Sequence, residues 1–303
     1  MFLAERILIM VNLNSCPVCS STSFKTVLNC KDYTVSQENF TIVACSDCGF
    51  EFTNPRPSDN VIGNYYKSED YISHSNTKKG IISQLYHGVR NYTLKKKIEL
   101  VSKYVSRGTI LDYGAGTGMF LNTCKLAGWK AFGIEPDSGA RKIAAEMNLS
   151  VYGTKHNILS DIPEVSFDAI TLWHVLEHVT DLEDTLNFFK NKLNPDGVLI
   201  IAVPNHTSFD AQYYKGFWAA YDVPRHLYHF HKETVEKLLG KFGFNLVETA
   251  PMKFDSFYVS MLSEKYKTGS INYLKAFIVG LKSNLKAKSA ENYSSVIYVF
   301  KKK

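Results

Sequence analysis

Residue types suited to holding a charged ligand gather between Thr109 and Gly118. A short apolar run has Asp112 near its end, and a second apolar run further along leads to Glu135. Between these runs, glycines recur at alternate positions, Gly114, Gly116 and Gly118, before a helical pattern. A strand, a glycine turn, a helix, a second strand and an acidic residue, in this order, form the first half of a Rossmann-like nucleotide site.

The chemistry of this stretch narrows the choice of ligand. A dinucleotide fingerprint would place its third glycine where this chain has Met119. The Asp112 carboxylate is unfavourable beside a pyrophosphate and favourable beside a cation. S-adenosylmethionine (SAM) carries an ammonium and a sulfonium group and no phosphate. Glu135 is placed to accept hydrogen bonds from ribose hydroxyls, a role that NAD enzymes share. The alternative is an ordinary strand–helix turn that binds nothing.

Three blocks of the chain resemble the class I SAM-dependent methyltransferases over residues 105–255. The blocks are Leu111–Gly118, Gly133–Pro136, and Phe167–Ile170 together with Trp173–His178. The last block is similar to the fourth-strand signature of the small-molecule branch of that superfamily. The resemblance implies an α/β fold with a Rossmann-like, seven-stranded mixed sheet in the order 3-2-1-4-5-7-6, whose last strand is antiparallel.

Residues that follow the expected strands are candidates for contact with SAM, because open α/β sheets bind ligands at the carboxyl ends of their strands. Asn157 comes after the third strand, where the resemblance implies a polar side chain at the adenine edge; a helix N-cap is the alternative. Trp173 and His174 end the fourth strand, and we expect them against the methionine part of SAM. The expected cofactor-binding set is Asp112, Tyr113, Gly114, Gly116, Gly118, Glu135, Pro136, Asn157, Trp173 and His174.

Two histidines are candidates for a catalytic base. His178 directly follows Glu177, and His226 lies in a segment, 224–230, similar to the family's Pro-x-His-x-x-x-Phe element. Methyl transfer depends mainly on positioning, and a base is needed only for a weakly acidic hydroxyl or carbon acceptor. We expect the catalytic residues to be His226, His178 and Glu177, with His226 preferred at the acceptor; a helix cap or a packed ring is the alternative for His178.

Four cysteines form two pairs, Cys16 with Cys19 and Cys45 with Cys48, and each pair has two residues between its members. This spacing lets both thiolates of a pair reach one ion, and four thiolates make a closed tetrahedral zinc site. We therefore expect a structural Zn²⁺ in a small ribbon, with an iron–sulfur cluster or a redox pair as alternatives. The remaining cysteines, at positions 30 and 124, are expected in the core.

Composition and charge constrain the partners. The chain has 303 residues and a net charge of +6, and its last residues, 281–303, are rich in lysine. We expect this end to be solubilising, with membrane-surface or polyanion contact as the alternative. The ribbon has few basic residues, so no nucleic-acid partner is expected. The chain has no run of 18 apolar residues, and we expect a cytoplasmic protein without a transmembrane segment.

The pattern of elements predicts three parts: a zinc ribbon over 1–57, a helical linker or lid over 58–105, and the methyltransferase domain with acceptor-binding insertions over 106–303. Strands are expected at 109–113, 130–134, 149–152, 167–173, 197–203, 245–252 and 294–301. A capping box of Thr180 and Glu183 is expected to open a helix over 181–193, and Lys95–Lys97 is expected to be a solvated helix face. Residues 260–289 have helical spacing, which indicates an extra packing helix, a homodimer contact or a membrane-surface helix.

A ribbon ahead of such a domain also resembles the nucleotide-sugar C-methyltransferases, which carry two similar cysteine pairs. We therefore expect SAM-dependent methylation, with SAH as product, of a small-molecule acceptor such as a sugar nucleotide or a surface-glycan precursor. The alternatives are O-methylation of a quinone-like or lipid-like acceptor, delivery by the ribbon to RNA or protein, and a SAM sensor without activity.

Overall fold

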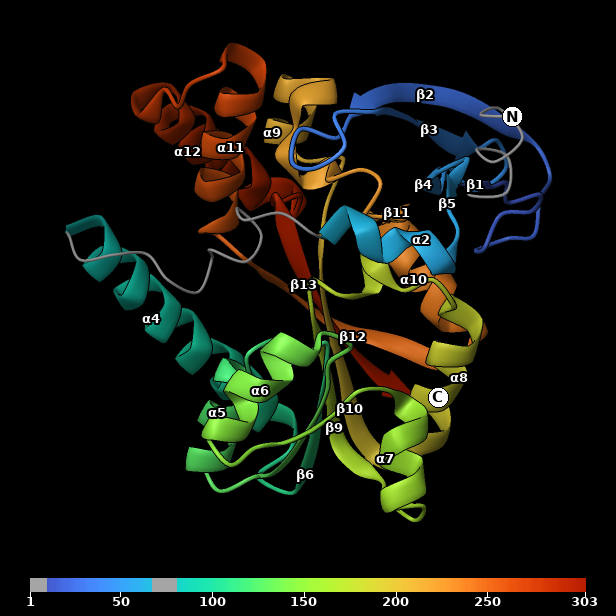
Figure 1. Ribbon diagram of the computed structural model, residues 1–303, viewed down its shortest axis with the longest axis vertical. Helices are drawn as coiled ribbons and strands as arrows, with labels where there is room; N and C mark the ends of the chain where they lie inside the picture. Colours follow the sequence, from blue (N-terminus) through green and yellow to red (C-terminus); the bar gives the residue numbers. More distant parts are fainter. Residues whose placement is uncertain (1–9, 67–80) are drawn as a thin grey trace.

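A seven-stranded sheet forms the centre of the molecule in the computed structural model, which describes residues 10–66 and 81–303 (Figure 1). The strand order is β12-β13-β10-β9-β6-β7-β8. Numbered along the chain from the other edge, this is 3-2-1-4-5-7-6, so the expected order is confirmed. Strand β13 runs antiparallel to both β10 and β12, whereas the pairs from β10 to β8 are parallel.

The strands begin and end close to their expected positions. Their bounds are β6 (Thr109–Tyr113), β7 (Lys130–Ile134), β8 (Ser150–Tyr152), β9 (Phe167–Trp173), β10 (Leu193–Pro204), β12 (Phe244–Pro251) and β13 (Ser295–Lys302). The clearest difference is β10, which begins at Leu193. Leu193 pairs with Phe167 of β9, and the regular register resumes only at Val198.

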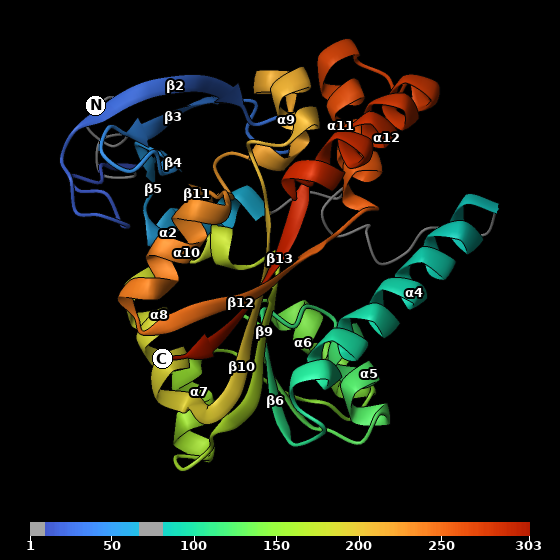
Figure 2. The same cartoon turned by 180° about the vertical axis from the view of Figure 1, so that it is seen from behind.

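Helices cover both faces of the sheet (Figures 1 and 2). One face packs against α4 (Ile81–Tyr104), α5 (Met119–Leu126) and α6 (Ser138–Glu146); the other packs against α7 (Lys155–Asp161), α8 (Leu182–Lys192) and α10 (Lys232–Lys241). Side chains of a strand alternate between faces. Accordingly, Ile110 belongs to the core under α4 and α5, while its neighbour Leu111 belongs to the core under α8 and α10.

The start of α8 differs from the expected capping box. Asp181 is the N-cap, and its carboxylate accepts from the backbone N–H of Asp184 at 3.1 Å. The carbonyl of Thr180 instead accepts from Arg56 at 3.0 Å. Aspartate caps a helix at least as well as threonine, so the cap lies one residue later than the sequence pattern indicated.

A smaller, four-stranded antiparallel sheet lies above the carboxyl ends of the central strands (Figure 1). The N-terminal segment contributes β2 (Phe24–Lys31), β3 (Asn39–Cys45) and β4 (Glu51–Thr53). The fourth strand, β11 (Tyr228–His229), comes from the long insertion after β10 and pairs with β4. Two further short strands, β1 (Met10–Val11) and β5 (Arg56–Pro57), pair with each other.

The remaining elements surround the same edge of the central sheet. They are α2 (Asp59–Ile62), η1 (Gly63–Tyr66), η3 (Leu176–His178), α9 (Phe209–Tyr214), η4 (Lys215–Phe217), η5 (Ala219–Tyr221), α11 (Asp255–Thr268) and α12 (Tyr273–Ala290). The expected lid over 58–105 therefore comprises α2, η1 and α4, and its residues 67–80 lie outside the described ranges. Across the described ranges, every helix is too short or too polar to cross a membrane.

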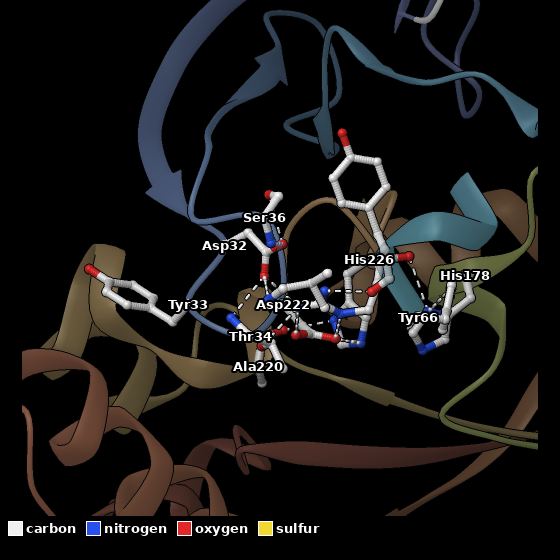
Figure 3. Close-up of polar contacts among 12 residues, drawn as sticks. Asp32, Tyr33, Thr34, Ser36, Tyr66, His178, Ala220, Asp222 and His226 are labelled. Atoms are coloured by element: carbon white, nitrogen blue, oxygen red, sulfur yellow. Dashed lines mark hydrogen bonds and ion pairs between the residues drawn. The ribbon is translucent and has the colours of Figure 1, made fainter. Parts of the chain in front are cut away.

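Arg225 joins the small sheet to the insertion after β10. Its guanidinium is 1% exposed and donates to both carboxylate oxygens of Asp222 at 3.0 and 2.6 Å, and to Asp32 at 3.0 Å. It also donates to Thr34 and to the carbonyl of Tyr65. Figure 3 shows Asp32, Thr34 and Asp222 converging from the β2–β3 turn and the insertion. One buried cation thus holds two anionic segments that are far apart in sequence.

Replacing Arg225 should destabilise the whole chain. Arg225→Met keeps the bulk of the side chain but leaves Asp32 and Asp222 without their shared cation, so we expect the free energy of unfolding to fall by about 3–5 kcal/mol. Urea unfolding followed by circular dichroism measures this change. The control is Arg107→Met at an exposed position, where a change within about 0.5 kcal/mol is expected. An Arg225→Met protein as stable as this control would contradict the bridge.

Candidate active site

The glycine turn after β6 bends sharply back over the sheet. Gly114, Gly116 and Gly118 all have positive φ angles of 78°, 53° and 80°, which other residues rarely adopt. A Cβ on Gly114 would lie 2.4 Å from a methyl group of Val175, whereas one on Gly116 would meet nothing within 4 Å. The turn is therefore packed at its first glycine and open at its second.

Glu135 stabilises the open part of this turn. Its carboxylate accepts from the backbone N–H of Gly116 at 2.8 Å and from that of Asp137 at 2.8 Å. The carbonyl groups of Glu135 and Pro136 accept from the guanidinium of Arg141. The two segments that the sequence placed in one site, the glycine turn and the end of β7, are thus in direct contact.

Asp112 is buried, at 2% exposure, and not open at the surface. Its carboxylate accepts from the Thr171 hydroxyl of β9 at 2.8 Å. Burial raises the pKa of Asp112 to about 7, against the opposing effects of this hydrogen bond and of nearby Lys97. A cation that approached the carboxylate would favour its ionised form.

Lys97 is a residue of this site that the sequence analysis missed. We expected Lys95–Lys97 to face solvent, but the ammonium of Lys97 lies 4.3 Å from the centroid of the Trp173 ring, and burial lowers its pKa. The expectation was wrong for Lys97 because this residue shares the inward face of α4 with Leu94, Ile98 and Val101. That helical spacing was a signal available in the sequence.

The other expected cofactor residues lie along the same edge of the sheet. Tyr113 packs edge-on against Phe189 of α8, with ring centroids 5.1 Å apart. Asn157 lies in the first turn of α7, and its side-chain oxygen accepts from the hydroxyl of Thr154, which is the N-cap. The N-cap role considered for Asn157 therefore belongs to Thr154.

His174 follows β9 in a left-handed conformation, with φ of 58°. Its Nε2 lies 3.0 Å from Asp255 and its Nδ1 lies 3.5 Å from Glu177. Burial alone would lower the pKa of His174, but these two carboxylates outweigh it and raise the pKa to about 9. His174 is thus an imidazolium at neutral pH, and Asp255, which opens α11, is a further residue that the sequence analysis did not identify.

His178 and His226, the two candidates for a base, lie next to each other. Their rings are 4.5 Å apart in an edge-to-face arrangement. Nδ1 of His178 lies 3.0 Å from the carbonyl oxygen of Arg225, and Nδ1 of His226 lies 2.9 Å from that of Ala220. A carbonyl oxygen only accepts, so Nδ1 carries a proton in both rings, and in the neutral form of each ring the lone pair is on Nε2.

Glu177 completes this cluster. It is fully buried, and among the described residues its carboxylate oxygens have no hydrogen-bond partner within ordinary distance. Burial would raise the pKa of Glu177, but the neighbouring histidines lower it, beginning with His174. Burial, with the neighbouring His226, lowers the pKa of His178 to about 4. His178 is therefore neutral at physiological pH, although His174 nearby is charged.

Tyr66 of η1 also reaches this cluster. The Tyr66 hydroxyl of η1 lies 2.9 Å from Nδ1 of His178 (Figure 3). The Asp222 carboxylate, held by Arg225, lies 4.0 Å from Nε2 of His226. The two histidine rings thus lie among residues of η1, of η3 and of the insertion after β10, next to the carboxyl end of β9.

The four paired cysteines converge as their spacing predicts. The Sγ atoms of Cys16 and Cys48 are 3.6 Å apart, those of Cys19 and Cys45 are 3.4 Å apart, and all four lie within 4.8 Å of one another. Tetrahedral zinc with bonds of about 2.3 Å would separate the sulfurs by about 3.8 Å, so the set fits this ion. Backbone N–H groups of Cys48 and Asp47, against burial, help to lower the pKa of Cys45 to about 7.

Comparison with known proteins assigns this architecture to a family. A family model described as a methyltransferase domain matches residues 86–249, just over half of the chain. An uncharacterized methyltransferase from Bacillus cereus is 34% identical over 100 residues, which are 32% of this chain and 47% of that protein. The chain thus spans about half the length of the first curated relatives it matches.

Two further proteins are similar over longer stretches. The ubiquinone biosynthesis O-methyltransferase of Azorhizobium caulinodans is 28% identical over 184 residues, 56% of this chain and 70% of that protein. The crystal structure of magnesium protoporphyrin IX methyltransferase from Synechocystis PCC 6803, with bound SAH, shares the fold. Its TM-score is 0.51 at 14% identity, covering 81% of this chain and all of that one. The chain therefore belongs to the methyltransferase domain family.

Proposed function

We propose that this protein transfers the methyl group of SAM to a small polar acceptor, of the class of sugar nucleotides and surface-glycan precursors. The observation that carries the proposal is the contact between Glu135 and the N–H of Gly116 at 2.8 Å, at the sheet edge that also holds His178 and His226. SAM, when bound, supplies a methyl group on a sulfonium that a nucleophile can displace. The chain's part is to bind, to orient and to accept a proton.

The residues present fit this cofactor. Gly116 borders open space, and the Glu135 carboxylate beside it suits a pair of ribose hydroxyls. Asp112 is proposed as the anion near the ammonium group, and Lys97, whose charge interacts with that of Asp112, as the cation for the carboxylate of the same amino acid. Trp173 and His174 border the methionine end, and Asn157 is the residue proposed for the adenine edge.

The His178–His226 pair is proposed as the proton acceptor. Both rings offer an Nε2 lone pair, because each Nδ1–H donates to a backbone carbonyl. Glu177, buried beside them, stabilises an imidazolium once a proton has been taken. This arrangement suits an acceptor hydroxyl, or an acidic carbon next to a carbonyl, better than an amine, which needs no such base.

A second acceptor class also has support. The relative from Azorhizobium is named as an O-methyltransferase of ubiquinone biosynthesis, and the proposed base would serve a phenol equally well. Measuring SAH release with a panel of sugar nucleotides and a panel of catechols and quinols separates the two classes. Release with sugar nucleotides supports the first proposal; release only with quinols replaces it with the second.

Four thiolates are proposed to hold a structural Zn²⁺ that stabilises the small sheet. Their site is closed, with no position left for a substrate. The ion would fix the start of β4, next to Cys48. At the end of this strand, the hydroxyl of Thr53 donates to the carbonyl of His226 at 2.9 Å. Through this bond the metal site would support the insertion that carries His226.

Glu135→Gln should weaken cofactor binding without unfolding the protein. Each hydrogen bond to a charged acceptor contributes about 1.5–3 kcal/mol, so we expect the Kd for SAM and for SAH to rise at least tenfold. Isothermal titration calorimetry measures both constants. Asp137→Asn, which alters a neighbouring carboxylate that caps α6, is the matched control. Wild-type affinity in Glu135→Gln, or competition by NAD, would refute the cofactor assignment.

The histidine pair should control the rate and not cofactor affinity. In His178→Asn and His226→Asn we expect kcat to fall by about 10²–10⁴-fold with an unchanged Kd for SAM. Exposed His156→Asn is the control. A base works unprotonated, and the pKa of His178 is about 4, so the wild-type rate should persist as pH falls below 6. A midpoint near the ordinary histidine value of about 6.5 would exclude His178 as the base.

Metal analysis tests the cysteine site. We expect one zinc per chain by mass spectrometry of the purified protein, and its loss in Cys19→Ser and Cys45→Ser together with a lower unfolding temperature. Cys30→Ser removes a buried thiol of the same sheet that lies outside the cluster, so it should retain the metal. Iron in place of zinc, or full zinc in both cluster variants, would disprove the assignment.

A further inference from the structure

Helix α12 presents a row of large apolar side chains to solvent. The row consists of Leu274, Phe277, Ile278, Leu281 and Leu285, which we call the α12 stripe. Their spacing places them on one side of the helix. Leu274 is 71% exposed, Phe277 57% and Leu285 54%. Continuous apolar surface of this kind marks a site of contact with a protein or a membrane.

The stripe does not result from loose packing of the helix. The opposite side of α12 is formed by small residues that are buried against α9 and α11, namely Ala276, Val279, Ser283 and Ala287. A Cβ on Gly280 would lie 2.8 Å from a ring atom of Phe257 and 3.0 Å from its Cα, so the two helices are in close contact.

Hydrogen bonds fix the rotation of α12 about its axis. Ser283 donates to the buried carboxylate of Asp210 at 2.6 Å, and Asn284 donates to the carbonyl of Lys253 at 2.8 Å. The Ser256 hydroxyl donates to the carbonyl of Gly280 at 3.1 Å. Turning the stripe inward would break these bonds and bury a lysine, so the apolar side is held outward.

Charge on the helix selects the kind of partner. α12 contains four lysines, 275, 282, 286 and 288, and no acidic residue; Lys275 is paired with Glu264 of α11 at 3.1 Å, so the charge available to a partner comes from the other three. A second copy that docked through the same face would oppose these lysines with its own and would offer no carboxylate from its α12. An anionic bilayer would accept the apolar row between its headgroups and neutralise the lysines. Apolar residues with flanking lysines are the composition of a helix that lies in a membrane interface.

We propose that the α12 stripe docks this protein on the surface of an anionic phospholipid bilayer. The helix hairpin begins at Asp255, whose carboxylate holds His174 at 3.0 Å, so the docking surface is connected to the candidate active site by a direct contact. The docking surface and the candidate active site therefore belong to elements that pack directly on each other.

Sedimentation of the 303-residue chain with vesicles tests the proposal. SAM and acceptor are left out, so the result is independent of the proposed activity. We expect binding to vesicles of phosphatidylcholine with phosphatidylglycerol, weaker binding to phosphatidylcholine alone, and release at high salt. Leu274→Ser with Leu285→Ser should weaken binding at least tenfold. The matched control is Leu126→Ser with Ile143→Ser, two exposed apolar residues on α5 and α6.

Charge variants complete the test. Lys282→Gln with Lys288→Gln should weaken binding about fivefold for each lysine removed, whereas Lys237→Gln with Lys241→Gln on α10 should not. The proposal is overturned if the wild type does not sediment with anionic vesicles, or if the control variants lose as much binding. It is also overturned if light scattering shows a dimer that Leu274→Ser with Leu285→Ser converts to a monomer while vesicle binding is absent.

Discussion

The buried ionic contact of Arg225 with Asp32 and Asp222 is the constraint on which the rest of the site depends. A guanidinium at 1% exposure is tolerated only when its charge is balanced and its N–H groups are bonded. Both anions must therefore be in place together, one from the turn between β2 and β3 and one from the insertion. The next residue, His226, inherits its position from this contact, so the N-terminal sheet takes part in building the site.

Backbone hydrogen bonds of strand β11 also attach the insertion to the small sheet. The insertion adds Tyr228 and His229 as an edge strand to β4, and Thr53 donates its hydroxyl to the carbonyl of His226. An edge strand has unpaired N–H and C=O groups that need partners. Pairing them with the insertion satisfies those groups and prevents the segment carrying His226 from moving independently of the cysteine cluster.

Environment divides the histidines of the site into two classes. His174 lies between the carboxylates of Asp255 and Glu177 and is held as a cation, whereas His178 is desolvated beside another histidine and is held neutral. His174 thus supplies a fixed positive charge, and His178, four residues later, supplies a lone pair that can accept a proton. The Glu177 carboxylate balances the positive charge of His174 and would stabilise His178 once that ring is protonated. These two charges explain why Glu177 lies fully buried without close hydrogen bonds.

Local sequence was sufficient to predict the strands, the glycine turn with Glu135, and the cysteine cluster, because each depends on short spacing or on alternation along one element. The strand order came from the family resemblance. Tertiary structure alone decided that β11 would join the small sheet, and that Asp255 and Arg225 would hold the histidine site. These contacts join residues far apart in the chain, and their partners are chosen by burial of charge and by unpaired backbone groups, which no local pattern records.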